Sequence, residues 1–499
     1  MLLVAALYAL ATALLVALGL HLGALALTRL ARPAAPVPEA APPPGQPWPD
    51  VLVQVPVYNE PPALAGRVLA AVAAQRYPGR VRVQLLDDST DGSARENARL
   101  CAARGAAHVR RATRDGFKAG ALAAGLRLDA EGHGPAGLGA EPGPASFAAI
   151  LDVDFEPPPD FLRRTVGALL ADGGLAFAQA RWTHPGAEAT ALGRVQAAVL
   201  DVHFAVEQGG RDRWGVPLAF NGTAGTWRVA AVEAAGGWQG DTLAEDLDLA
   251  LRAQLGGWRA RLLDDLAVPA ALPPTLSAWR VQQTRWTKGG VEVARKLLGR
   301  TWRSSLPLYA KGAVTFQTLV ALALPALLAV VVLHPWLGAS LALGAPLPPV
   351  LALALDAGYL ALAGVVLAHV VAQRALHPAD WMRRLVALPF VLAAPIALVG
   401  PASRGVAEAL AGRRSAFVRT PKTGGAGRGA SRGDLALAAY SAAGLGVLGA
   451  VGAWPAVPFQ ALLASGSLAV VALARREGRL RAASRPERLP LPEPSRAAA

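Results

Sequence analysis

Two carboxylates one residue apart, Asp152 and Asp154, have the clearest chemical potential in this sequence. They follow the apolar run 147–151 and precede three consecutive prolines. A short apolar run between loop residues predicts a buried β-strand. Ligands of open α/β sheets bind at the carboxyl ends of strands, where two carboxylates could hold Mg²⁺ or Mn²⁺ against a diphosphate. The pair alone is equally typical of a solvated strand end.

The sequence before this pair of carboxylates predicts the sheet that would position them. Residues 51–55 and 81–86 have the pattern of strands, and residues 64–75 between them have the pattern of a helix. A strand-helix-strand unit predicts a parallel sheet with a right-handed crossover. The segments 56–60 and 87–88 would then share an edge of the sheet with the later carboxylates. Solvated turns with helix caps are the alternative, and no Walker or Rossmann phosphate loop is present.

Two later helices carry polar groups at suggestive positions. Residues 242–252 predict a helix whose first turn holds Glu245 and Asp246, which also suits the helix dipole. Asp248 would face away from Asp246, as a surface or supporting group. Gln282, Arg285 and Trp286 stand at i, i+3 and i+4, so they share one helix face. An amphipathic interfacial helix with a Trp anchor explains the same spacing.

Composition places part of the chain in lipid. Hydrophobic residues make up 53% of the 499 residues and charged residues only 17%. The net charge of +14 could indicate nucleic acid, but the basic residues crowd beside apolar segments, as in cytoplasmic loops of membrane proteins. We therefore expect a bilayer and no nucleic acid as partner. The single cysteine, Cys101, excludes an intrachain disulfide and a cysteine-cluster metal site.

The apolar segments define the predicted domain organisation. Residues 1–28 predict an uncleaved transmembrane anchor rather than a signal peptide, and the arginines after it place the next domain in the cytoplasm. A Pro-rich linker, 29–50, too Pro-rich to pack, leads to a cytoplasmic domain, 51–300, with an interfacial helix at its end. A transmembrane region, 301–476, and a disordered basic tail, 477–499, complete the prediction.

Within the transmembrane region, spans are expected at about 313–333, 350–372, 435–451 and 455–474. The stretch 385–400 is broken by Pro389 and Pro395 and has basic residues on both sides. Either it is re-entrant or one span is misplaced, because a single crossing cannot have two cytoplasmic flanks.

Several motifs occur in an order that resembles family 2 glycosyltransferases, in the processive membrane-embedded branch that contains cellulose synthase and the cellulose-synthase-like mannan and glucan synthases. The resemblance spans about 51–290. It rests on the segments Val55–Glu60, Leu86–Asp91, Gly116–Leu122, Asp152–Phe155, Gln179–Trp182, Phe220–Gly225, Glu245–Asp248 and Gln282–Trp286. It implies a GT-A fold, that is, an α/β domain with a mixed, mainly parallel sheet, joined here to a multi-pass α-helical membrane region.

The resemblance also implies a role for each matching residue. The catalytic residues would be Asp246, as the base that deprotonates the acceptor, and Glu245 beside it. The nucleotide sugar would be bound by Pro56, Tyr58, Glu60, Asp87, Asp88, Lys118 and Asp152. The acceptor would meet Gln282, Arg285, Trp286, Gly222 and Thr223. Mg²⁺ or Mn²⁺ would be held by Asp152 and Asp154.

A segment near the end of the membrane region, 415–424, resembles the gating loop of cellulose synthase. Its matching residues are Phe417, Thr420 and Lys422. Arg419 stands where that loop has Val, so a basic surface loop is the alternative.

The function that follows from the resemblance is inverting β-transfer of a hexose from GDP-mannose or UDP-glucose to a growing polysaccharide. We expect processive synthesis coupled to export, in the plasma or inner membrane if the source is bacterial. A non-processive enzyme that makes a β-hexosyl lipid shares the same motifs and remains an alternative. A membrane scaffold or transporter with a degenerate transferase domain is the alternative from another class. The motifs do not specify the sugar, the acceptor, any export partner or the oligomeric state.

Overall fold

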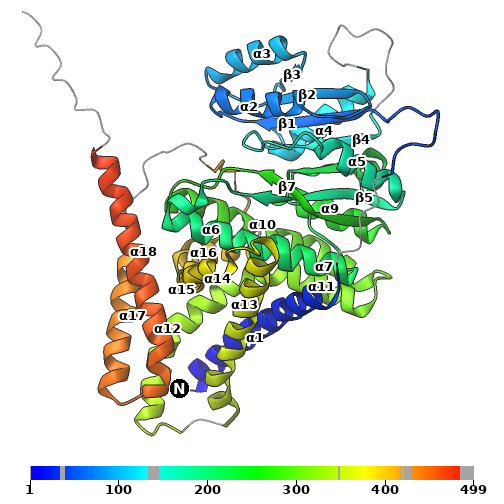
Figure 1. Ribbon diagram of the computed structural model, residues 1–499. Coiled ribbons are helices and arrows are strands. Elements are labelled where there is room, and N and C mark those ends of the chain that lie inside the picture. The colour runs from blue at the N-terminus through cyan, green and yellow to red at the C-terminus, as the bar shows by residue number, and fades with distance from the viewer. Residues whose placement is uncertain are drawn as a thin grey trace, which may run out of the picture.

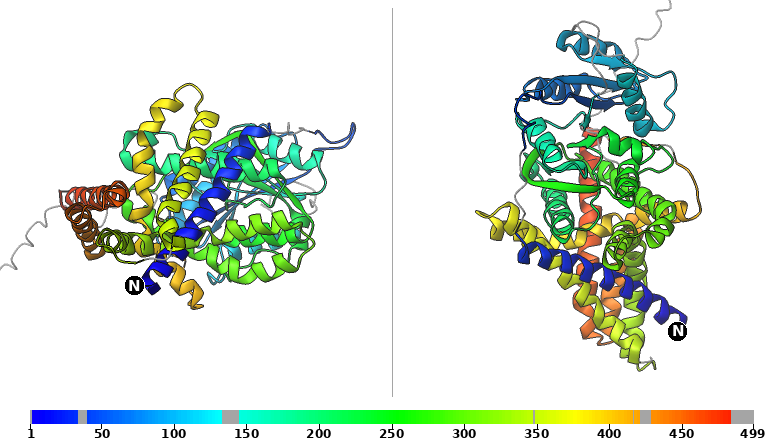
Figure 2. Two further views of the ribbon diagram at one scale, coloured as in Figure 1. Left: turned by 90° about the horizontal axis from the view of Figure 1, so that it is seen from below. Right: turned by 90° about the vertical axis from the view of Figure 1, so that its right-hand side faces the viewer.

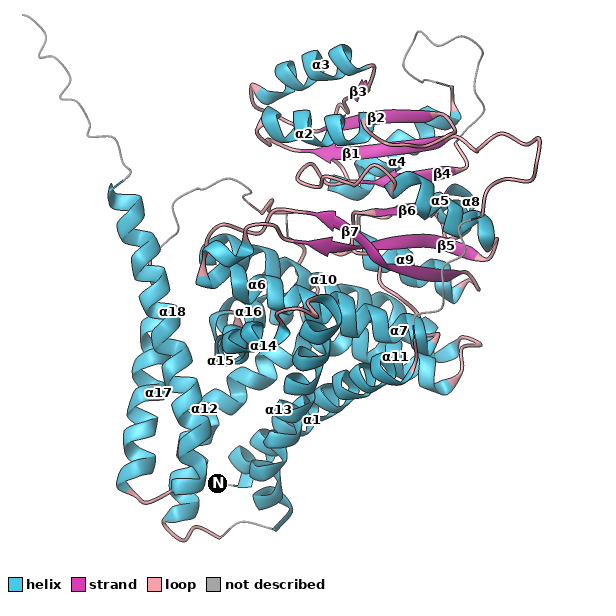
Figure 3. Cartoon of the chain, viewed as in Figure 1, coloured by secondary structure: helices cyan, strands magenta, loops and turns pink. Residues whose placement is uncertain are grey.

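The structure is a computed structural model that describes residues 2–33, 40–132, 145–346, 349–415, 417–420 and 429–483. Its strands gather in one half of the molecule and its long apolar helices in the other (Figures 1 and 3).

The strands form one seven-stranded sheet in the order β3-β2-β1-β4-β6-β5-β7. β6 is antiparallel to β4 and β5, and the other neighbouring strands are parallel. This confirms the predicted mixed, mainly parallel sheet. The strands are β1 (Val51–Val57), β2 (Val81–Asp87), β3 (Ala107–Val109), β4 (Phe147–Ile150), β5 (Leu175–Thr183), β6 (Gly225–Arg228) and β7 (Arg259–Pro269).

An apolar layer on each face holds the sheet. One layer packs Val53 and Val55 against Val68, Cys101 and Phe161, with helices α2 (Pro62–Ala73), α3 (Ser93–Arg104) and α5 (Phe161–Ala171). The other surrounds Phe177 and Trp227, with helices α4 (Phe117–Ala130), α8 (Val229–Ala234) and α9 (Glu245–Leu255). Burying side chains from both faces fixes the strand ends, and hence the polar groups that follow them.

Between the sheet and the membrane helices lies a layer of helices (Figure 1). It contains η1 (Ala187–Ala189), α6 (Ala191–Val202), a π-helical turn η2 (His203–Gln208), α7 (Gly209–Trp214) and α10 (Leu276–Arg303). Ion pairs tie this layer and the sheet to the membrane helices. Arg29 pairs with Asp264, and Arg280 reaches Asp434 at 2.7 Å.

Five helical segments are long and apolar enough to cross a membrane, counted over the residues that the structure describes. They are Leu2–Ala31, Leu308–Ala342, Ala357–Leu376, Arg432–Ala450 and Trp454–Arg479. The elements are α1 (Leu2–Ala31), α11 (Leu308–Leu319), η3 (Val320–Leu322), α12 (Ala323–Ala342), α13 (Pro349–Leu376), α17 (Arg432–Ala450), η6 (Trp454–Ala456) and α18 (Val457–Ala483). Each matches a predicted span.

Helix α1 runs beside α13 (Figure 2). Small residues allow the close approach. A Cβ atom on Gly19 would lie 2.6 Å from the Ala361 Cα, and one on Gly23 would lie 3.5 Å from Gly364. Small residues are the usual solution where membrane helices pack closely.

The stretch 385–400 is a broken helix, as its prolines predict. It comprises η4 (Leu385–Ala387), α15 (Leu388–Ala393) and η5 (Ala394–Ala397), and α14 (Trp381–Arg384) directly precedes it. It meets α16 (Val399–Leu410) at a bend of 45°, which makes the pair either a broken span or a re-entrant loop.

The described part of the Pro-rich linker does pack, so the prediction that it is too Pro-rich to pack is wrong there. The rings of Trp48 and Tyr77 are 5.4 Å apart, and the Tyr77 hydroxyl donates to the Pro49 carbonyl at 2.6 Å. Residues 34–39 of the linker and most of the predicted tail lie outside the described residues.

Candidate active site

A small cavity of about 80 Å³ gathers eight of the predicted site residues. Its walls come from the start of α4, the turn after β4, the turn before β6, the start of α9 and one face of α10. The predicted residues that line it are Lys118, Asp152, Gly222, Glu245, Asp246, Gln282, Arg285 and Trp286. These eight residues are spread over more than 160 positions of the chain, so only the fold brings them together.

Lys118 bridges two of the walls. Its Nζ atom lies 2.6 Å from Asp152 Oδ1 and donates to the Gly222 carbonyl at 2.8 Å. Burial alone would lower the pKa of Lys118, but the charges of Asp152 and Glu245 hold it above its ordinary value. A lysine that stays charged in a buried cavity is suited to bind a diphosphate.

Glu245 and Asp246 stand side by side in the first turn of α9. Burial and the neighbouring Asp246 charge raise the pKa of Glu245 to about 7. Burial also raises the pKa of Asp246, against the opposing charge of Lys118. Two adjacent carboxylates with raised pKa values can accept a proton near neutral pH, which is what a general base requires.

The glycine at position 222 sets how close the loop before β6 comes to this pair. Its φ is +75°, and a Cβ atom there would lie 2.7 Å from Asp246 Oδ2 and 3.4 Å from Lys118 Nζ. Next to it, the Thr223 hydroxyl accepts a hydrogen bond from the Asp152 backbone N–H at 2.8 Å. Thr223 is buried, so it positions Asp152 and does not line the cavity.

The predicted polar face of α10 is confirmed, because Gln282, Arg285 and Trp286 all line the cavity. Burial lowers the pKa of Arg285, while the charges of Glu245 and Asp246 work in the other direction. Asp248, in contrast, is fully buried and is not a surface group. It pairs with Arg252 at 2.8 Å and Lys296 at 3.0 Å, so it is a supporting residue that fixes α9.

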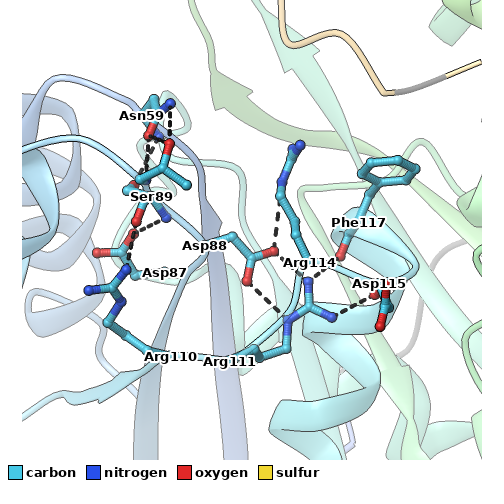
Figure 4. A network of polar contacts seen from close by, with 10 residues as sticks. Asn59, Asp87, Asp88, Ser89, Arg110, Arg111, Arg114, Asp115 and Phe117 are labelled. Carbon is cyan, nitrogen blue, oxygen red and sulfur yellow. Dashed lines mark hydrogen bonds and ion pairs between the residues drawn. The ribbon is translucent and has the colours of Figure 1, made fainter.

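The loops after β1 and β2 are held by the polar network that Figure 4 shows. Asp87 is 1% exposed and turns inward. Its carboxylate binds His108 at 2.9 Å, Asn97 at 3.0 Å and the Ser89 N–H at 2.8 Å. It therefore holds the loop together and does not face the cavity.

Asp88 points toward two arginines (Figure 4). Arg111 binds it at 3.0 and 2.5 Å, and Arg114 lies 4.0 Å away. The Arg114 guanidinium also covers the ring of Tyr58 at 3.4 Å. Pro56, Tyr58, Glu60, Asp87 and Asp88 do not line the cavity, and their contact with a nucleotide stays a prediction.

The described part of the candidate gating segment reaches over these loops. The Phe417 ring stacks on Phe117 at 6.0 Å, and Arg419 pairs with Glu60. The Arg419 side chain thus binds a residue predicted to hold the nucleotide. Thr420 is 4% exposed, and Lys422 lies outside the described residues.

The predicted metal ligands differ in exposure. Asp152 lines the cavity with a side chain that is 33% exposed, whereas Asp154 is 4% exposed and does not line it. No group of three or more His, Cys, Asp or Glu residues is arranged to hold a metal among the described residues. One or two carboxylates still fit Mg²⁺ or Mn²⁺ when the other ligands are a diphosphate and water.

Sequence reasoning missed several residues around the cavity. His184 and Asn221 line it, and Arg111 and Arg114 organise the loop after β2. The signal for the arginines was the basic cluster 110–114 directly before Gly116 and Lys118. Asn221 stands in the segment Phe220–Gly225 that carries the resemblance, next to Gly222, whereas His184 is placed by the fold, through its contact with the Ala270 carbonyl at 3.1 Å.

Comparison with known proteins agrees with this geometry. Residues 52–230 match the family described as Glycosyl transferase family 2, and residues 148–371 match Glycosyl transferase family group 2. Glucomannan 4-beta-mannosyltransferase 1 of Oryza sativa subsp. japonica is 41% identical over 258 residues, which are 50% of this chain and 47% of that protein. Glucomannan 4-beta-mannosyltransferase 2 of Arabidopsis thaliana is 39% identical over 257 residues, 50% of this chain and 46% of that protein. The chain thus spans about half the length of the curated relatives it matches.

A solved structure shares the fold. It is a mannosyltransferase from Pyrobaculum calidifontis in complex with GDP-Man and Mn²⁺, 21% identical, with a TM-score of 0.50. The match covers 82% of this chain and 100% of the other. Together, the sheet topology, the residues gathered at its edge and the two family matches show that the chain contains a glycosyltransferase domain of family 2.

Proposed function

We propose that this enzyme transfers a mannosyl residue from GDP-mannose, with inversion, to an acceptor hydroxyl group. The observation that carries the proposal is the meeting of Lys118 and Asp152 with Glu245 and Asp246 in one cavity. One pair suits a diphosphate and the other suits removal of a proton. The similarity to two glucomannan 4-beta-mannosyltransferases supports mannose as the sugar.

In the proposed reaction, the acceptor hydroxyl gives its proton to the Asp246 carboxylate as its oxygen attacks the anomeric carbon. A new C–O bond forms on the face opposite the leaving group, and the bond from the anomeric carbon to the phosphate oxygen breaks. The electron pair of that bond leaves with GDP. Lys118 and Arg285 are the cationic side chains of the cavity that would bind the diphosphate.

Asp152 and Asp154 are the residues that would hold Mg²⁺ or Mn²⁺, which would supply charge neutralisation for the leaving diphosphate. The Mn²⁺ in the Pyrobaculum calidifontis complex supports this part of the proposal. Asp152 sits at the cavity beside Lys118, where a diphosphate would have to lie.

One candidate acceptor is a growing polysaccharide, extended processively and exported through the membrane region. It is supported by the position of Trp286, which offers an aromatic platform on α10 where the catalytic layer meets the membrane helices. The catalytic half would lie in the cytoplasm. The alternative is a non-processive lipid glycosyltransferase. It is favoured by a large, mainly apolar cavity between the membrane helices that Asp246 also lines.

Transfer from radiolabelled GDP-mannose and UDP-glucose, measured in parallel with the full chain in proteoliposomes containing Mg²⁺ or Mn²⁺, tests the proposal. We expect label from GDP-mannose in a product that β-mannosidase or β-mannanase degrades. Transfer from UDP-glucose alone would contradict mannose as the sugar. An absence of transfer from both donors would contradict the proposed reaction.

A further inference from the structure

A second, much larger cavity opens from the active site into the membrane half of the molecule. It has a volume of about 1080 Å³ and is bordered by α1, α12, α13, α15 and α18. Asp246, Asn221 and Trp286 line both this cavity and the small one above it. The candidate base therefore faces a space that continues between the membrane helices.

The end of this cavity nearest Asp246 is polar. The His203 Nδ1 atom lies 2.6 Å from Glu207 Oε2, and the Asn221 amide lies 2.6 Å from His203 Nε2. Asn221 is held from its other side by Gln208, which donates to its Oδ1 at 2.8 Å. His203 Nδ1 thus faces a carboxylate and Nε2 faces an amide, and His203, Glu207 and Gln208 all belong to the π-helical turn η2. π-Helical turns are frequent at functional sites.

The charged groups at this polar end leave no excess positive charge. Although burial opposes ionisation, the hydrogen bond from His203 and the charge of Arg211 hold the pKa of Glu207 below its ordinary value. Arg211 supplies one positive charge, and its Nη2 atom lies 3.3 Å from His21 Nε2. Two carboxylates, Glu207 and Asp246, line the cavity together with this one guanidinium. Such an end suits a head group that carries hydroxyls, and it offers an anion no excess positive charge.

Deeper in the cavity the walls become apolar. On α1 the lining residues between Thr12 and His21 are Leu15, Leu18 and Gly19. On α13, between Tyr359 and His369, they are Ala361, Leu362 and Val365. At a rise of about 1.5 Å per residue, these intervals span roughly 13–15 Å.

A sugar chain crossing this zone would lose the hydration of its hydroxyls and gain few partners from these two helices, which is unfavourable. A hydrocarbon chain would instead be buried among apolar side chains, which is favourable. The apolar part of the cavity thus favours a lipid acceptor over a polysaccharide, a choice that the motifs alone left open.

We propose that the large cavity holds the hydrocarbon tail of the acceptor, so that the acceptor is a membrane lipid with an uncharged, hydroxyl-bearing head group. This inference rests on the proposed function and names its acceptor class. The head-group hydroxyl at the polar end gives its proton to Asp246, its oxygen bonds to the anomeric carbon, and GDP leaves as above. A glycan grown on such a lipid would keep its tail in this cavity.

The test uses alkyl β-mannosides as acceptors for the full chain, at concentrations below their micelle-forming range, with GDP-mannose and Mn²⁺. We expect KM to fall by about tenfold or more from the methyl to the octyl mannoside, because the longer chain buries more apolar surface. Octyl phosphate, which has an anionic head group, should not be mannosylated.

A matched pair of variants separates the cavity from general partitioning into detergent or lipid. Leu18 lines the cavity, so Leu18→Trp places a larger side chain inside it. Leu20→Trp adds the same side chain on the outer face of α1, where Leu20 is 54% exposed. Leu18→Trp should raise KM for the octyl mannoside but not for the methyl mannoside, and Leu20→Trp should change neither.

Three results would overturn the inference while leaving the proposed function intact. They are a KM that does not depend on alkyl length, an equal effect of the two tryptophan variants, and efficient mannosylation of octyl phosphate. The chain-length series needs only the unchanged protein, so it decides the question even if Leu18→Trp fails to fold. Absence of transfer to every acceptor would instead overturn the proposed function, and this inference with it.

Discussion

The ring of Phe417 lies 4.5 Å from the Arg285 guanidinium and 5.9 Å from that of Arg114. One aromatic side chain from the candidate gating segment thus contacts an arginine of the catalytic cavity and an arginine of the loop after β2. Segments from three distant parts of the chain meet at this ring.

Phe417→Ala should therefore weaken donor binding. Loss of the two ring contacts removes about 1 kcal/mol, which corresponds to roughly a fivefold increase in KM for the donor. Steady-state kinetics at saturating acceptor would measure it. Val418→Ala, which changes a neighbour that is 59% exposed, is the control and should leave KM unchanged. Equal KM values for Phe417→Ala and the unchanged protein would show that the segment does not act on the donor.

Gly222→Ala should lower kcat by about 100-fold, because its Cβ atom would displace the candidate base. Gly215→Ala is a matched control: its φ of +72° imposes similar strain, but no atom lies within 4 Å of the added Cβ. We expect both variants to lose similar stability and only the first to lose turnover. If both lost turnover alike, strain and not the Asp246 contact would explain the effect.

The raised pKa values of the acid pair predict the pH dependence. Asp246 must be ionised to accept a proton, and burial raises its pKa, so kcat/KM should rise with pH on an acidic limb that lies above the range of an ordinary aspartate. Glu245→Gln removes one of two repelling charges, so the acidic limb should move to lower pH. A pH profile of both proteins checks this, and an unmoved limb would show that Glu245 does not couple to the titrating group.

The same pKa has a consequence for stability. The folded protein binds the Glu245 proton more tightly than the unfolded chain, in which the pKa of Glu is about 4.3. The contribution of Glu245 to the free energy of unfolding is therefore fully present below that pH and is lost as the pH rises through about 7. Glu245→Gln should flatten this decline in denaturant titrations.

Much of this arrangement follows from local sequence patterns. The strand ends carrying Asp152 and the helix faces carrying Asp246 and Trp286 were predictable, because apolar periodicity fixes which residues follow a strand or share a helix face. The inward turn of Asp87 was not predictable, because its partner His108 comes from β3. The burial of Asp248 was not predictable either, because its partner Lys296 lies 48 residues away on α10. Both positions depend on side-chain pairs that only the folded chain brings together.

Asp152→Asn and Asp154→Asn should each abolish the increase in GDP-mannose affinity that Mn²⁺ produces, measured by calorimetry with and without the ion. Each substitution removes the carboxylate charge that would bind the ion and leaves the side-chain volume almost unchanged. Asp91→Asn, at an exposed position after β2, is the control. If Asp154→Asn keeps the full metal effect, the buried Asp154 carboxylate is structural.

The most direct test of the account is Asp246→Asn, assayed for GDP-mannose binding and for single-turnover mannosyl transfer in the same preparation. We predict donor binding close to that of the unchanged protein, and transfer reduced by about 10³-fold or more, because the acceptor proton loses its base. Asp241→Asn, near the same helix and about half exposed, should transfer normally. Transfer by Asp246→Asn at the rate of the unchanged protein would contradict Asp246 as the base and with it the proposed mechanism.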